Sequence, residues 1–219
     1  MTDQTLALRD AGRAISFSFD DLMKYHGGGS PGGVAQAYKV LERALPLLSP
    51  DEPPERREIS LRTPFGGPGF RDAFEMVARA VTGDRFVVDS DLLRPDLGRN
   101  REQFVYHVRY RDRTVTLHIR EGLVRDDFIE LLHTDGRTAE QDAHFETLKQ
   151  DFADRLMAGS AEDAYDVEDA PSSKRRLVSM ISTEGKTQEE LTQQVWEAHL
   201  KYQATLAQSK QEAPEDRRT

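Results

Sequence analysis

The chain has 219 residues, of which 37% are hydrophobic and 32% charged, and its formal net charge is −9. This length suffices for one buried core with an appendage, and the acidic balance argues against nucleic-acid binding, which needs a basic field. The absence of cysteine excludes disulfides, iron–sulfur clusters and thiolate zinc sites. Because no apolar stretch reaches the roughly 20 residues that span a bilayer and no signal-peptide pattern is present, we expect a cytoplasmic protein without a membrane partner.

The N-terminal part combines a patternless segment, a glycine-rich loop and a helix. Residues 1–14 carry little pattern and are expected to form a flexible arm. The loop at 26–33 contains Ser30 followed by Pro31, which favours a helix start because Ser caps helices and Pro is tolerated at the first position. Apolar residues then recur at helical spacing over 34–48, so this helix should lay one face on the core.

Strands and helices alternate through the middle of the chain. Residues 58–63 alternate apolar and polar side chains, as a strand does. A second glycine-rich turn, 64–69, leads into a helix with an apolar side over 70–81, and a short strand follows at 86–88. The arrangement of elements indicates the α+β class.

Two alternating segments, 104–110 and 114–120, predict the clearest hairpin in the sequence. The tight turn between them sets a register in which Val108 faces Val115. One face of the pair is then apolar throughout, so the register is well specified.

The C-terminal part contains a helix and a polar extension. Thr138 and Gln141 resemble a capping box ahead of a helix that reaches Leu156. A later helix has a narrow apolar stripe, which we expect to pack on a second subunit of a homodimer. The fold class is thus α+β, with a mixed or antiparallel sheet, helices packed on it and a C-terminal helical arm. The expected parts are a flexible arm (1–14), a core domain (15–157), an acidic linker (158–186), a helix (187–208) and a disordered tail (209–219).

The glycine-rich loop is the first candidate binding site. Glycines let a backbone approach a ligand closely, and free N–H groups at a helix start attract anions. His26 beside it could bind a metal or move a proton near neutral pH; the alternative is a structural turn with a satisfied histidine. The spacing matches neither a Walker A loop nor a dinucleotide fingerprint, so the loop carries no nucleotide-binding motif. The candidate ligand-binding residues are Tyr25, Gly27, Gly28, Gly29, Ser30 and Gly32.

Two motifs resemble a known family. The run His-Gly-x-x-Ser-Pro-Gly at 26–32, followed by Tyr-Lys at 38–39, resembles the opening motif of the formylmethanofuran dehydrogenase E-subunit family, where His-Gly-His-x-Cys-Pro-Gly starts the first long helix. The family also has a Cys-x-x-Asp-Ala segment leading into a helix that ends in Thr-Gly. Here it reads Gly-Phe-Arg-Asp-Ala at 69–73, with Thr-Gly at 82–83. The similarity covers roughly residues 17–157.

The departures from the family pattern remove most of its metal ligands. Gly28 stands where the family has its second histidine, and Ser30 and Gly69 stand where it has cysteines. Of the polar set that the resemblance implies, His26, Ser30 and Asp72 remain. A divalent metal such as zinc, held by His26 with Asp72 and waters, is one expectation, and an anion held by the loop N–H groups is another. The family further implies one-carbon metabolism and an association with molybdenum or tungsten enzymes.

His107 and His118 are weaker metal candidates. The hairpin register makes them diagonal neighbours about 7–8 Å apart, which suits one metal only with favourable rotamers. An exposed or covered polar sheet face explains them as well.

The leading hypothesis is therefore a metal- or small-ligand-binding protein with its site at His26. The alternative is an accessory protein with a decayed site that binds a partner through its C-terminal arm. A third is an enzyme in which His26 is a general base on a small acid and Asp72 orients it. The resemblance does not establish catalysis.

Overall fold

The N-terminal segment forms a hairpin. In the computed structural model, which describes residues 5–168, β1 (Leu6–Asp10) pairs antiparallel with β2 (Arg13–Phe17). Residues 6–10 therefore do not belong to the flexible arm that we expected over 1–14.

The reason lies in the turn and in two leucines. Ala11 and Gly12 both have positive φ, the conformation of the two-residue turn that joins strands most tightly. Leu6 and Leu8 are buried. Two apolar positions are too short a pattern to distinguish a strand from a loop in the sequence, and the strand forms because it has a partner and a core to cover.

The main sheet has five strands in the order β4-β3-β5-β6-β7. Only β3 and β4 are parallel, and the other pairs are antiparallel. The register expected for the central hairpin is confirmed, because Val108 pairs with Val115. The strands are β3 (Ile59–Thr63), β4 (Phe86–Val88), β5 (Val105–Tyr110), β6 (Arg113–Ile119) and β7 (Tyr165–Glu168).

Helix starts follow the local rules of capping. Ser18 and Asp21 form a capping box at α1, and Thr138 and Gln141 form the expected one at α5. The helices are α1 (Phe19–His26), α2 (Pro31–Leu48), α3 (Pro68–Ala78), α4 (Asp126–Leu132), α5 (Ala139–Ala158) and α6 (Ala161–Ala164). Short 3₁₀ turns lie at Arg56–Glu58, Ser90–Leu92 and Pro95–Leu97.

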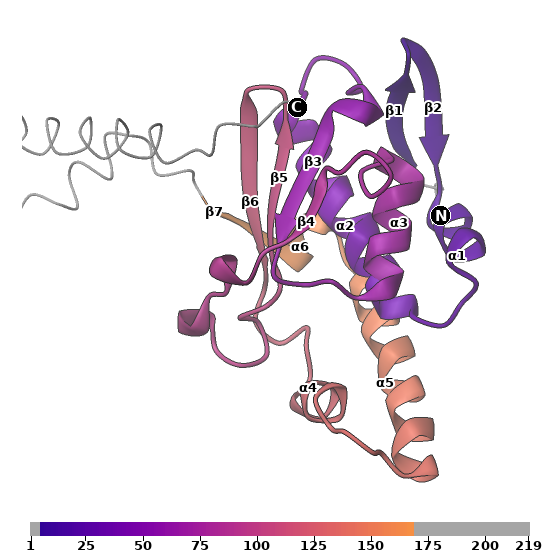
Figure 1. The fold of residues 1–219 in the computed structure, drawn as a ribbon, viewed down its shortest axis with the longest axis vertical. Helices are drawn as coiled ribbons and strands as arrows, with labels where there is room; N and C mark the ends of the chain where they lie inside the picture. The colour runs from indigo at the N-terminus through magenta and orange to yellow at the C-terminus, as the bar shows by residue number, and fades with distance from the viewer. Residues whose placement is uncertain (1–4, 169–219) are drawn as a thin grey trace, which may run out of the picture. The chain divides into compact units, whose positions relative to one another are not determined.

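Helices α1, α2 and α3 contact one another on one side of the sheet, as Figure 1 shows, and α2 lies against β5 and β6. α5 packs along α2. The core fills the space between these helices and the sheet, so the α+β class is confirmed. None of the helices between residues 5 and 168 is long and apolar enough to cross a membrane.

The segment after α5 differs from the expected linker. α6 and β7 add a short helix and an edge strand, with Tyr165 buried opposite Ile119. Three apolar residues in an acidic stretch, Ala161, Ala164 and Tyr165, anchor it. The rest of the linker, the helix at 187–208 and the tail lie outside the described residues.

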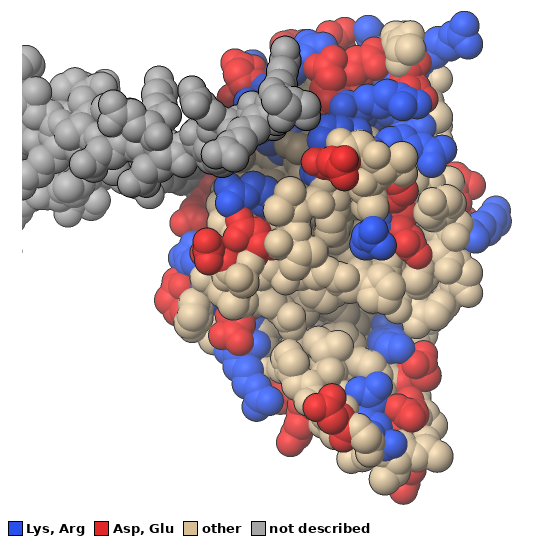
Figure 2. All heavy atoms as spheres, in the orientation of Figure 1, with Lys and Arg blue, Asp and Glu red and all other residues tan. Residues whose placement is uncertain are grey.

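The surface is mixed in charge. Figure 2 shows acidic and basic side chains interspersed around a central area with few charges. Exposed side chains of opposite charge form ion pairs, such as Arg111 with Glu58 and Arg120 with Asp166. Exposed pairs of this kind contribute little to stability, so the fold depends on its apolar core.

Candidate functional site

His26 and Asp72 lie together, although 46 residues separate them in the chain. His26 is the last residue of α1 and Asp72 lies in the first half of α3. The His26 Nδ1 atom is 2.8 Å from Asp72 Oδ2. The imidazole is only 8% exposed, whereas the carboxylate side chain is 43% exposed. The structure thus joins a buried imidazole to a carboxylate that reaches solvent.

The pairing decides which ring nitrogen is available. In the neutral tautomer that donates Nδ1–H to Asp72, Nε2 of His26 carries the lone pair. That atom is buried and has no hydrogen-bond partner within the described part of the chain. A buried polar atom without a partner is costly and uncommon. The lone pair on Nε2 can therefore accept a hydrogen bond from a ligand or coordinate a metal ion.

The same geometry favours one of the two roles expected of Asp72, that of orienting His26. Because its carboxylate bonds Nδ1, it orients the ring rather than sharing a ligand on Nε2. Among residues 5–168 no three His, Asp or Glu side chains gather closely enough to hold a metal ion. At this site the protein supplies one nitrogen that could bind a metal ion, Nε2 of His26, and Asp72 orients the ring through Nδ1.

Two of the loop glycines serve the turn between helices. Gly27 ends α1 in the left-handed conformation, with its N–H bonded to the Met23 carbonyl, and Gly28 is also left-handed. Glycine adopts this conformation without strain. A Cβ on Gly28 or Gly29 would meet nothing within 4 Å, so neither is needed for packing.

The glycines at the start of α2 have a different role. A Cβ on Gly32 would lie 3.0 Å from the Phe152 ring of α5, and one on Gly33 would lie 2.9 Å from the Phe70 backbone nitrogen. A Cβ on Gly69 would lie 2.4 Å from the Ser30 carbonyl oxygen. These glycines let three helices approach closely. Gly32 therefore has a packing role, and its contact with a ligand stays a prediction.

Ser30 begins α2 as expected, but its hydroxyl makes no capping bond. Its carbonyl accepts the N–H groups of Gly33 and Val34. The position also touches the second motif, since a Cβ on Gly69 would lie 2.9 Å from Ser30 Cβ. Positions 30 and 69 are thus in direct contact.

Two side chains near the loop differ in accessibility. Tyr25 is 49% exposed, so it is free to meet a ligand or solvent. Lys149 of α5 reaches the Gly29 carbonyl at 3.4 Å, a contact that sequence reasoning missed because it depends on how α5 packs. Lys39 of α2 is buried and pairs with Glu42 at 2.8 Å. Its role is therefore structural.

The other two candidate histidines lie on the sheet face away from α2. His107 is paired with Arg62 and Thr116, and His118 is paired with Val105, as the predicted register requires. Burial, followed by the nearby Arg62 guanidinium, holds the pKa of His107 below its usual value. The neutral imidazole is thus the favoured form in the fold.

This lowered pKa predicts a pH dependence of stability. When pH falls through about 6.5, the unfolded chain gains a proton at His107 that the folded chain does not, so the free energy of unfolding decreases. We expect this decrease to be smaller in His107→Gln. Urea unfolding of both proteins at pH 7.5 and 5.5 measures it, and other titrating groups cancel in the comparison. An equal decrease in both would contradict the prediction.

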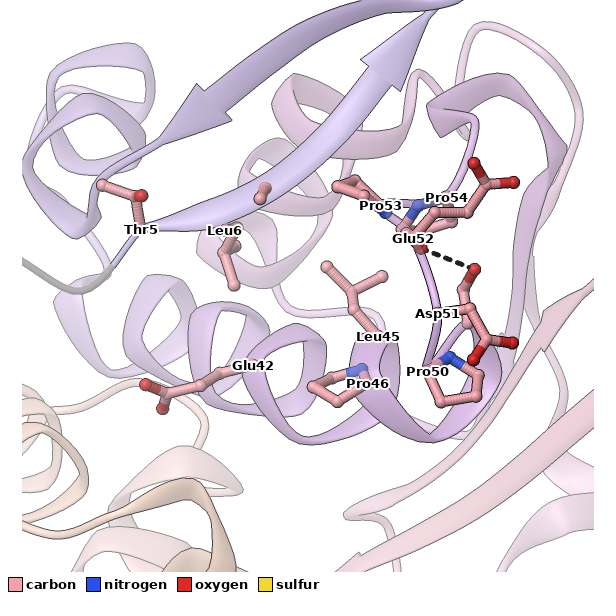
Figure 3. A pocket seen from close by; sticks show the side chains of 12 residues that line it. Thr5, Leu6, Glu42, Leu45, Pro46, Pro50, Asp51, Glu52, Pro53 and Pro54 are labelled. Atoms are coloured by element: carbon pink, nitrogen blue, oxygen red, sulfur yellow. Dashed lines mark hydrogen bonds between the residues drawn. The ribbon is translucent and has the colours of Figure 1, made fainter.

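A separate hollow lies at the other end of α2. Figure 3 shows it between β1 and the loop after α2, lined by prolines such as Pro46 and Pro53, with Glu42 at its edge. Its volume is about 330 Å³. Pro31 and Leu45 are about 21 Å apart along the helix at 1.5 Å per residue, so this hollow is distinct from the His26 site.

No known family model matches the chain, and no curated protein is similar to it.

Proposed function

We propose that this protein binds a small ligand, a divalent metal ion such as zinc foremost, through Nε2 of His26. The observation that carries the proposal is the buried imidazole whose Nδ1 bonds Asp72 at 2.8 Å and whose Nε2 has no partner among the described residues. A carboxylate behind a ligating histidine fixes its tautomer and raises its basicity. The arrangement suits a ligand that takes a lone pair.

The burial of His26 Nε2 limits the size of a ligand that can bond it. Nε2 is enclosed, so what bonds it must be small, such as a metal ion or the acidic hydrogen of a small molecule. The adjacent start of α2 adds the positive end of a helix dipole, which favours negative charge on anything bound with the ion.

We further propose that the core resembles the formylmethanofuran dehydrogenase E-subunit family at this site. The support is that residues of the two motifs contact each other in the fold. Positions 26 and 72 of the two motifs are hydrogen-bonded, and positions 30 and 69 are in contact. The packing of α1, α2 and α3 on one another brings the two motifs, which are distant in the sequence, into one region. The one-carbon and molybdenum association belongs to the same proposal.

Zinc titration by calorimetry tests the proposed function, using the full chain without a histidine tag. We expect His26→Ala to weaken zinc binding at least tenfold and Asp72→Asn to weaken it by roughly tenfold, because the ring loses its orienting partner. His144→Ala is the matched control, since that imidazole is exposed. Zinc affinity that is unchanged in His26→Ala would refute the proposal.

The alternative function, partner binding through the C-terminal arm, concerns residues outside the described range, as does the homodimer expected from it. No described residue favours it over the His26 site.

A further inference from the structure

Four arginines converge where α3 ends. Arg56 donates to the carbonyls of Met76 and Val77, and Arg85 donates to those of Ala78 and Arg79. The carbonyl end of a helix is its negative pole, so both guanidiniums are held there by charge and by geometry. These two inner arginines form a rigid base.

The two outer arginines are differently placed. Arg57 donates from Nε to Asp10 at 3.0 Å, and its side chain is 67% exposed. Arg79 lies 3.8 Å from Glu75, beyond hydrogen-bond distance, and is 47% exposed. Each guanidinium carries five donors, so both keep N–H groups that no described residue engages.

Between these side chains lies a cavity of about 460 Å³. Within the described part of the chain it is lined by three guanidiniums and no carboxylate. Figure 2 shows Lys and Arg side chains gathered over the end of α3 and the start of β3, in the upper part of the view. The lining residues are Arg57, Arg79, Thr82, Gly83 and Arg85.

Asp10 and Glu75 carry the carboxylates that pair with the outer arginines, and neither residue lines the cavity. Glu75 accepts hydrogen bonds from the backbone N–H groups of Val81 and Thr82 and from the Thr82 hydroxyl. It thereby holds the loop that forms one wall. Asp84 lies in the same loop but does not line the cavity.

The electrostatics agree with this geometry. Burial lowers the pKa of Arg85, and the neighbouring Arg57 lowers it further, although Glu75 opposes them. Burial also lowers the pKa of Arg56; Asp10 opposes this shift, whereas Arg79 and Arg57 add to it. Guanidiniums that repel one another across a cavity are relieved by an anion between them. This occurs in a chain whose net charge is −9, so the local excess of positive charge is not a property of the whole surface.

We propose that this cavity, formed by Arg57, Arg79 and Arg85 beside the Thr82–Gly83 turn, binds the phosphate group of a small phosphorylated molecule. Guanidiniums match phosphate oxygens in pairs, which favours phosphate over a monovalent anion. The volume lies in the range of small-molecule sites and leaves room for a group attached to the phosphate. The site is independent of His26 and of the function proposed there.

The test is pyrophosphate and inorganic phosphate binding to the full chain, measured by calorimetry at 150 mM salt. The variant is the double substitution Arg57→Gln with Arg79→Gln, which spares the arginines that hold the end of α3. We expect pyrophosphate affinity to fall at least tenfold, because two charge-assisted bonds are lost. Pyrophosphate should bind more tightly than phosphate.

Arg125→Gln is the matched control, because Arg125 has the same 47% exposure and also pairs with a carboxylate. Its affinity for pyrophosphate should equal that of the wild type. Equal weakening in the control and the double variant would reduce the effect to general surface charge and overturn the proposal. So would the absence of pyrophosphate binding by the wild type. His26→Ala should leave pyrophosphate affinity unchanged, which separates this site from the zinc site.

Discussion

Gly69→Ala is expected to lower the free energy of unfolding by about 3 kcal/mol, the upper end of the usual cost of overpacking. The added Cβ would lie 2.4 Å from the Ser30 carbonyl oxygen and 3.1 Å from the Val34 nitrogen. Both contacts are with backbone, which no side-chain rotation can relieve. Helix α3 would have to move away from α2, and the apolar contacts between the two helices would loosen.

Gly29→Ala is the control for this change. Gly29 lies in the neighbouring loop, and a Cβ there meets nothing within 4 Å. Its unfolding free energy should stay within about 0.5 kcal/mol of the wild type. Urea unfolding followed by circular dichroism measures both. Equal stability of the two variants would show that the crossing of α2 and α3 is looser than the structure has it.

The glycines illustrate what could be learned from the sequence about this site. Their number suggested a ligand-binding loop. Number alone does not distinguish glycines that approach a ligand, glycines that form left-handed turns and glycines that let helices pack closely. Gly27 and Gly28 supply left-handed turns, whereas Gly33 and Gly69 supply room for helices. Only the three-dimensional packing distinguishes these roles, since a residue's neighbours across a helix crossing are distant in sequence.

The fold was predictable wherever local chemistry decides it. The β5–β6 register follows from alternation and a tight turn, and the α5 start follows from its capping box. β1 and β7 could not be found in the same way. Each is short, with few apolar positions, and forms because a partner strand and a buried surface are already present.

Part of the candidate site was likewise predictable from the sequence, and part depends on packing. The resemblance implied that His26 and Asp72 share one site, and the structure places Nδ1 of His26 2.8 Å from Oδ2 of Asp72. Asp72 orients the ring because it bonds Nδ1, and the sequence does not reveal which ring nitrogen it contacts. The arginine cavity left no sequence signal, because Arg57, Arg79 and Arg85 have no common spacing and meet only where α3 ends.

The second large effect is expected at Phe70, directly after Gly69. Its ring is fully buried and lies 5.0 Å from the Tyr106 ring in a stacked arrangement. It also packs against Phe65, Phe74 and Phe86. Phe70 therefore joins α3 to the central strand β5 and to the edge strand β4.

Phe70→Ala should lower the free energy of unfolding by about 4 kcal/mol, because the cavity left behind cannot collapse between a helix and a sheet. Phe70→Leu keeps part of the apolar volume and should cost less than half as much. Tyr25→Ala removes an aromatic ring that is 49% exposed and should change stability by no more than about 0.5 kcal/mol. Urea unfolding at pH 7.5 ranks the three. If Phe70→Ala cost no more than Tyr25→Ala, the aromatic cluster would not be the link between the helices that position His26 and Asp72 and the sheet beneath them.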